Sequence, residues 1–217
     1  AVSYLAVIGG LAMMRDIPKV ARRSGRGIQQ MREGMAYIRE RNVLMLPILI
    51  GGFVGIFGMN FNVWIPLLAK NEFKVGADGF GILMAALGIV SLCGALHLAF
   101  RKDRPKGRTI VFTSLMLGSV EVALATAASV PLSVAVALLM LPFMGYAMSS
   151  TGAMANTLVQ TSSPEEMRGR VMAAYMALAA GAAPAGAFLM GAIANSFGTP
   201  TSILFGGCAT IVCALAI

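Results

Sequence analysis

Charged residues are scarce in this chain, and its polar stretches are short. Of the 217 residues only 12% are Asp, Glu, Lys or Arg, which is about half the share found in soluble domains. Hydrophobic residues make up 58% and the mean hydropathy is +0.80, so the chain has too little polar surface to cover a core in water. The composition therefore excludes a soluble protein and indicates that the solvent is lipid.

Side chains that carry chemistry are equally sparse. The sequence has one His and three Cys, and Cys93, Cys208 and Cys213 lie within apolar runs without C-x-x-C or metal-ligand spacing. It contains no Ser/His/Asp grouping and no G-x-S-x-G, H-E-x-x-H or P-loop motif, so hydrolase and ATPase functions lack a site. We expect no enzyme, no cofactor and no metal site.

Apolar runs of membrane-spanning length fill most of the chain. A helix needs about 20 residues to cross a bilayer core about 30 Å thick. A shorter run, residues 1–14, is interpreted as the end of a truncated span. The sequence thus predicts an all-α membrane protein with six to seven transmembrane helices, of which six are expected at 43–69, 80–100, 109–129, 131–160, 171–197 and 201–217.

Basic residues dominate the charge, but their distribution does not indicate nucleic acid binding. The net charge is +8, and 15 of the 17 Lys and Arg residues lie in three alternate connections, at 15–41, 101–108 and 168–170. This excess marks one face as cytoplasmic, so we expect a multi-pass protein of the plasma (inner) membrane. Residues 27–41 have an apolar stripe at helical spacing, which predicts an amphipathic helix that either lies flat on the cytoplasmic surface or forms a solvated connector.

Three stretches resemble the major facilitator superfamily, in particular its enterobactin exporter and drug efflux branch. Residues 33–39 read E-G-M-A-Y-I-R, residues 66–83 carry P-L-L-A and then G-A-D-G-F-G-I-L, and residues 160–171 read Q-T-S-S-P-E-E-M-R-G-R-V. This resemblance covers the whole chain and implies the C-terminal bundle of a twelve-helix fold. Residues 15–42 would form a cytoplasmic linker and 43–217 a six-helix bundle with a truncated last helix, and the N-terminal half of the same polypeptide would be its partner.

The resemblance also implies a cytoplasmic gate. Residues 103–108 read D-R-P-K-G-R and resemble the family's D-R-x-G-R-R loop with one residue inserted. The R-G-R at 168–170 lies where a loop enters a helix, and because cations there oppose the helix dipole, a partner acid is expected from Glu165, Glu166 or the N-terminal half. A positive-inside loop, or an anchor to anionic lipid, is the alternative role for these residues. The implied gate residues are Asp103, Arg104, Arg108, Glu165, Arg168 and Arg170.

Two spans are implied to face a central cavity, because the halves of this family are inverted repeats of three helices whose first helix lines it. On 43–69, four residues share one helical face that either contacts a bulky amphipathic substrate or lies against lipid: Phe53, Phe57, Asn60 and Trp64. On 131–160, a small and polar face either contacts substrate or hydrogen-bonds a neighbouring helix, and it comprises Gly145, Ser149, Gly152, Asn156 and Gln160.

Glu121 is the only acidic residue well inside a predicted span. A carboxylate at that depth costs about 2.5–3.5 kcal/mol on insertion scales. Glu121 is therefore either a candidate for proton coupling or a structural or interfacial residue. The sequence alone leaves both interpretations open.

These observations predict a secondary active transporter that couples protons to the efflux of small amphipathic molecules, such as drugs or siderophores, by alternating access. Its expected partners are membrane lipid, a small-molecule substrate, protons and the N-terminal six-helix half, and not nucleic acid. An importer, or a non-transporting membrane sensor or scaffold on the same fold, is the alternative. A cavity that changes its accessible side would distinguish a transporter from a scaffold.

Overall fold

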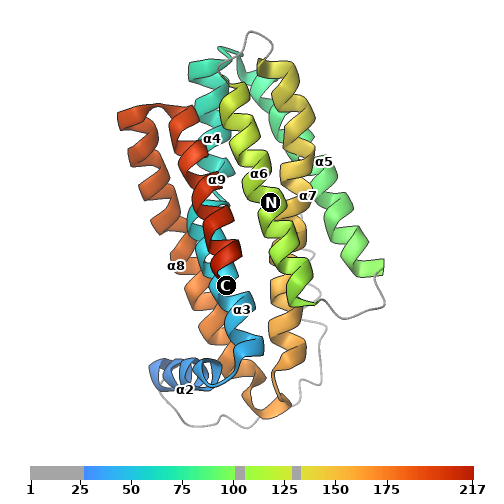
Figure 1. The fold of residues 1–217 in the computed structure, drawn as a ribbon, viewed down its shortest axis with the longest axis vertical. Helices are drawn as coiled ribbons and strands as arrows, with labels where there is room; N and C mark the ends of the chain where they lie inside the picture. Colours follow the sequence, from blue (N-terminus) through green and yellow to red (C-terminus); the bar gives the residue numbers. More distant parts are fainter. Residues whose placement is uncertain (1–26, 101–105, 129–132) are drawn as a thin grey trace, which may run out of the picture.

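The computed structural model describes residues 27–100, 106–128 and 133–217, which form helices and short connections without a strand (Figure 1). Six segments of these ranges are long and apolar enough to cross a membrane. The predicted all-α membrane protein with six spans is thereby confirmed, while the short run at 1–14 lies outside the described residues. The elements are α2 (Gly27–Arg39), α3 (Asn42–Phe57), α4 (Phe61–Leu67), the π-helical η1 (Leu68–Glu72), α5 (Ala77–Phe100), α6 (Gly107–Ala127), α7 (Ser133–Ser162), α8 (Glu165–Phe197) and α9 (Thr199–Ala216).

The spans form two triplets, and each helix of one triplet packs against a helix of the other. The first triplet comprises α3 with α4, then α5 and α6, and the second comprises α7, α8 and α9. Helix α3 packs against α8, α7 packs against α5, and α6 packs against α9. Packing of this kind between the two triplets is expected of inverted repeats related by a pseudo-two-fold axis. Helix α2 lies across one end of the bundle, beside the first turns of α3 and α8 (Figure 1).

The first span is not one continuous helix, which corrects the prediction of a single helical run at 43–69. Helix α3 ends at Phe57 and α4 begins at Phe61. Asn60 Nδ2 donates a hydrogen bond of 2.7 Å to the Ile56 carbonyl, so a side chain replaces a backbone donor at the break. Gly186 of α8 lies directly against the Ile56 carbonyl, and a Cβ on Gly206 of α9 would lie 2.6 Å from the Phe57 carbonyl oxygen. Protein therefore covers the break, as irregular backbone at membrane depth requires.

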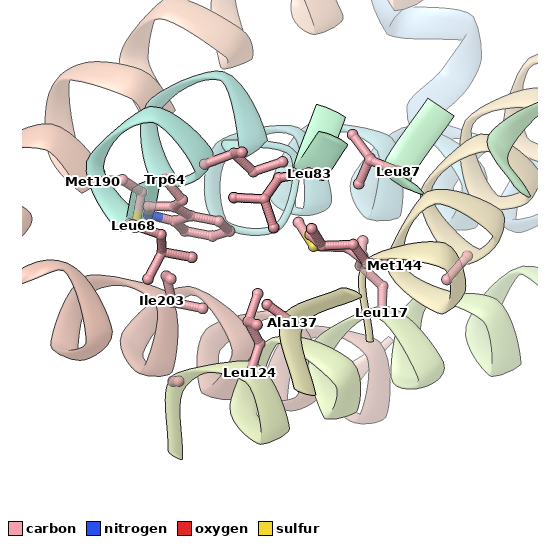
Figure 2. Close-up of a cluster of buried hydrophobic side chains, with 14 of the residues drawn as sticks. Trp64, Leu68, Leu83, Leu87, Leu117, Leu124, Ala137, Met144, Met190 and Ile203 are labelled. Carbon is pink, nitrogen blue, oxygen red and sulfur yellow. The ribbon is translucent and has the colours of Figure 1, made fainter. Parts of the chain in front are cut away.

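Trp64 ties α4 to the last two helices. Its side chain is 1% exposed, and Nε1 donates to Ser202 Oγ at 3.0 Å, while Ser202 Oγ donates to the Met190 carbonyl at 2.7 Å. Figure 2 shows the indole lying with Leu68, Met190 and Ile203 in the bundle interior. Because lipid provides little hydrophobic drive for helix association, close packing and buried hydrogen bonds of this kind hold the helices together.

Glycines set the distance between the packed helices. Gly118 of α6 and Gly207 of α9 face each other, since a Cβ on either one would lie 2.7–2.8 Å from the carbonyl oxygen of the other. Gly145 of α7 lies directly against the Leu87 carbonyl of α5. These contacts bring backbones together in the way that small residues allow in membranes.

Replacing Trp64 by Phe is expected to lower the free energy of unfolding by about 1–2 kcal/mol, because it removes a buried hydrogen bond and keeps most of the ring. Trp64→Ala is expected to cost about 3–5 kcal/mol, because it also leaves a cavity. Denaturant unfolding in detergent micelles measures both. Phe188→Leu is the control, because Phe188 is 81% exposed; equal losses for Trp64→Phe and Phe188→Leu would contradict a stabilising indole bond.

Cysteines introduced at both ends of the bundle test its orientation in the membrane. Lys106 and Glu165 are exposed before α6 and at the start of α8, whereas Asn71 is exposed in η1 at the opposite end. The positive-inside distribution predicts that cysteines replacing Lys106 and Glu165 react with an impermeant maleimide only from the cytoplasm, and one replacing Asn71 only from outside. Labelling of the Lys106 position in intact cells would contradict this orientation.

Candidate functional site

An apolar groove of about 170 Å³ lies between α3 and α8. Gly52 leaves room for Leu178, whose Cδ2 would lie 3.2 Å from a Cβ on that glycine. Phe53 is 39% exposed, and its ring stacks on Phe57 with centroids 6.5 Å apart and an interplanar angle of 8°. The groove thus offers a flat aromatic surface without charge, and it is lined by Ile48, Leu49, Gly52, Phe53, Ile56 and Leu178.

The break in the first span separates the four residues that were expected to share one helical face. Phe53 lines the groove and Phe57 lies one turn further along α3, where its ring meets Phe205 edge-on at 6.3 Å. Asn60 and Trp64 are 3% and 1% exposed and lie inside the bundle. Because α4 restarts the helix after Gly58, its side chains do not continue the face of α3. Trp64 accordingly lies neither in the groove nor at a lipid interface.

The polar residues of α7 lie along the helix from the level of the break to its C-terminal end. Gly152 faces the break, since a Cβ there would lie 3.7 Å from Met59 Cε. One turn later, Gln160 Nε2 donates to Asn156 Oδ1 at 2.8 Å, and Ser149 is half-buried. Hydrogen bonds from α7 to neighbouring helices come from other residues: Thr151 Oγ1 donates to Thr113 Oγ1 of α6 at 2.8 Å, and the Tyr146 hydroxyl lies 3.3 Å from His97 Nδ1 of α5.

Glu121 is completely buried in the interface between α6 and α9. Its Cβ would lie 3.0 Å from a Cβ on Gly207, and neither carboxyl oxygen has a hydrogen-bond partner among the described residues. The Thr210 hydroxyl oxygen of α9 is likewise buried without a partner within these ranges, and a Cβ on Gly58 would lie 2.9 Å from it. Buried polar atoms without partners are uncommon and call for a functional or chemical explanation.

In the described part of the chain, no three His, Cys, Asp or Glu side chains gather as a metal site would require.

At the end of the bundle where α2 lies, the two arginines of the R-G-R motif have different partners. Arg170 Nη1 lies 2.8 Å from Glu33 Oε2 of α2. Arg168 Nε donates to the Gln160 carbonyl at 3.2 Å, near the C-terminal end of α7, where the helix dipole favours a cation. Among the described residues the partner acid of Arg170 is therefore Glu33 of the E-G-x-x-Y-x-R stretch, and not the predicted Glu165 or Glu166.

Two other predicted gate residues, Arg108 and Glu165, lie at the same end of the bundle as the R-G-R motif. Glu165 and Glu166 are exposed in the first turn of α8 and form no ion pair within the described ranges. Their negative charges suit a helix N-terminus. Arg108 is exposed at the start of α6. Asp103 and Arg104 lie outside the residues that the structure describes.

Comparison with known proteins identifies the family. The family model described as transmembrane secretion effector, of the major facilitator type, matches residues 1–217. No curated protein and no solved structure matches the chain. The match spans the six apolar segments and the connections that form the groove, the buried acid and the Glu33–Arg170 ion pair. The chain belongs to the transmembrane secretion effector family of the major facilitator superfamily and is a multi-pass membrane transporter.

Proposed function

We propose that this chain is the C-terminal helical bundle of a secondary active transporter that exports small amphipathic molecules from the cytoplasm in exchange for protons. Drugs and siderophores are the substrate classes that the resemblance suggests. Export would proceed by alternating access in the plasma (inner) membrane, together with an N-terminal six-helix half. The single observation that carries the proposal is the aromatic groove between α3 and α8, which adjoins a broken helix.

The position of the groove supports a transport role. Helix α3 opens the first triplet and α8 belongs to the second, so the groove lies where the two repeats meet. Transporters bind their substrates at such repeat interfaces and next to discontinuous helices. A break such as Gly58–Asn60 gives the two parts of one span freedom to tilt separately. A groove beside this break would therefore change shape as the cavity alternates.

The lining of the groove supports an amphipathic substrate. All six lining residues are apolar, so binding would rest on apolar contact and on stacking against the Phe53 ring. Polar groups of the same substrate would find the amides of Asn156 and Gln160 on α7. The polar face of α7 and the Phe53 face of α3 are then the two sides of one proposed substrate cavity.

We further propose that Glu121 carries the coupling proton. A structural glutamate would be expected to hydrogen-bond, yet this one is fully buried without a partner in the described ranges. An uncompensated carboxylate is costly inside a bilayer, so the packed α6–α9 interface favours the neutral acid. A conformation that admits water between these helices would release the proton, and this difference would couple proton movement to the conformational change.

The proposed cytoplasmic gate consists of Asp103, Arg104, Arg108, Glu165, Arg168 and Arg170. The contact of Arg168 with the Gln160 carbonyl supports this role, because it links the ends of α7 and α8. A contact that forms in one conformation and breaks in the other shifts their equilibrium by its own free energy. The gate would close the cytoplasmic side when these contacts form.

Removing the aromatic surface tests the groove. In the intact transporter, Phe53→Ala is expected to raise the KM for efflux of an amphipathic fluorescent dye about 2- to 10-fold, because one aromatic stacking contact is lost. Expression should be unchanged, since Phe53 is partly exposed. Dye efflux from energised cells measures this, and Phe188→Ala is the matched control. An unchanged KM for Phe53→Ala would place the substrate elsewhere. If neither the unmodified transporter nor its variants moved any dye, that result would argue against drug export.

Glu121→Gln tests proton coupling. Gln has nearly the same shape as the neutral acid, so the variant is expected to fold and to move substrate down its concentration gradient. Uphill efflux driven by a pH gradient should be lost, because the side chain no longer exchanges a proton. Reconstituted vesicles with and without a pH gradient measure both activities. Glu72→Gln, at an exposed acid in η1, is the control, and full proton dependence in Glu121→Gln would assign a structural role to Glu121.

A further inference from the structure

The structure joins two motifs that lie far apart in the sequence. Glu33 and Gly34 of the E-G-x-x-Y-x-R stretch both contact Arg170 of the R-G-R stretch. We propose that α2 is a docked clamp, held on α8 by Glu33 and Gly34, which makes the cytoplasmic ends of α3 and α8 move as one body. Glu33 is then a positioning residue for the transport cycle, and Arg170 acts through α2.

The charged contact sets where α2 docks. Arg170 Nη1 lies 2.8 Å from Glu33 Oε2, with the two side chains 31% and 40% exposed, and the same Nη1 approaches Met167 Sδ at 3.6 Å. An ion pair with this exposure contributes little stability by itself. Its role is therefore to select the register and direction of α2 on α8.

Backbone contact at Gly34 brings the two helices together. A Cβ on Gly34 would clash with the Arg170 carbonyl oxygen, and it would lie 2.8 Å from the carbonyl carbon and 3.3 Å from Val171 N. Glycine in the interior of a helix is less favourable than alanine, so its presence in α2 needs a reason. Only glycine lets the backbone of α2 rest on the backbone of α8.

An apolar cluster lies under α2 and joins it to α3 and α8, with one residue added by α7. Ile38 of α2, Leu44 of α3, Val159 of α7 and Val171 of α8 belong to one buried cluster, apart from the main core. The Arg41 guanidinium also lies 4.5 Å from the centre of the Tyr37 ring, which ties the end of α2 to the start of α3. Helix α2 thus packs on the first turns of two spans, α3 and α8.

One residue links the clamp to the groove. Ile48 of α3 is part of the buried cluster under α2 and also lines the groove with Leu178 of α8. Docking of α2 therefore fixes the spacing of α3 and α8 at the cytoplasmic end of the groove. The docking itself does not depend on the proposed function; only the consequence for substrate access rests on it.

Charge reversal with rescue tests the register contact. In the intact transporter, Glu33→Arg or Arg170→Glu is expected to speed amide hydrogen exchange severalfold in α2 and in the first turns of α3 and α8. The double variant that carries both substitutions should restore the protection of these amides. Glu40→Arg, at an exposed acid beyond the end of α2, is the control and should have no effect. Protection of α5 reports that each variant is folded. The clamp would be overturned if the double variant failed to restore protection, or if the single variants sped hydrogen exchange in α2 alone.

Two glycine-to-alanine substitutions give a second, independent test by the same measurement. Gly34→Ala is expected to undock α2 and to speed exchange across the same three segments, although alanine favours helix. Gly169→Ala is the matched control, because a Cβ there meets nothing within 4 Å. Exchange in Gly169→Ala should be unchanged or slower. Equal exchange in the two variants would overturn the steric basis of the clamp.

Discussion

Lipid offers no hydrogen bonds, so every backbone group of this protein has to be satisfied or covered by the protein itself. The break at Gly58–Asn60 is where that constraint is hardest to meet. The Asn60 amide donates to one freed carbonyl, and Gly186 and Gly206 bring α8 and α9 directly onto the break. The position of both helices against the first span follows from covering this irregular segment. A side chain larger than hydrogen at either glycine would force them apart.

Helix association elsewhere follows the same physical logic. Where a soluble bundle would rely on the removal of apolar surface from water, these helices meet through glycines and a few buried hydrogen bonds. The Gly118–Gly207 contact, the Thr151–Thr113 bond and the Trp64–Ser202 bond each join different helices. The exposed apolar side chains of α5 and α8, such as Ile89 and Phe188, are compatible with lipid or with another part of the transporter.

The features proposed for transport meet on α3. Its middle forms one wall of the groove with α8, and its break at Gly58 touches Thr210, one turn from the Gly207 that faces Glu121. Its first turns lie in the cluster under α2. A tilt of α3 would therefore disturb the groove, the interface around the buried acid and the clamp together. Coupling between separate sites requires such a shared two-state element.

The sequence by itself determined the solvent, the helical class and the order of the six described spans, because these follow from composition and from the length of apolar runs. It also indicated candidate functional residues: Glu121 by its depth in a span, and Arg168 and Arg170 by their place at a helix start. The interior of the bundle was decided only by the tertiary structure. Helical periodicity put Phe53 and Trp64 on one face, but a short break between α3 and α4 rotated Trp64 into the core. The partner of Arg170 was likewise out of reach, because pairing with Glu33 depends on how α2 folds back onto α8, and sequence separation carries no information on that distance.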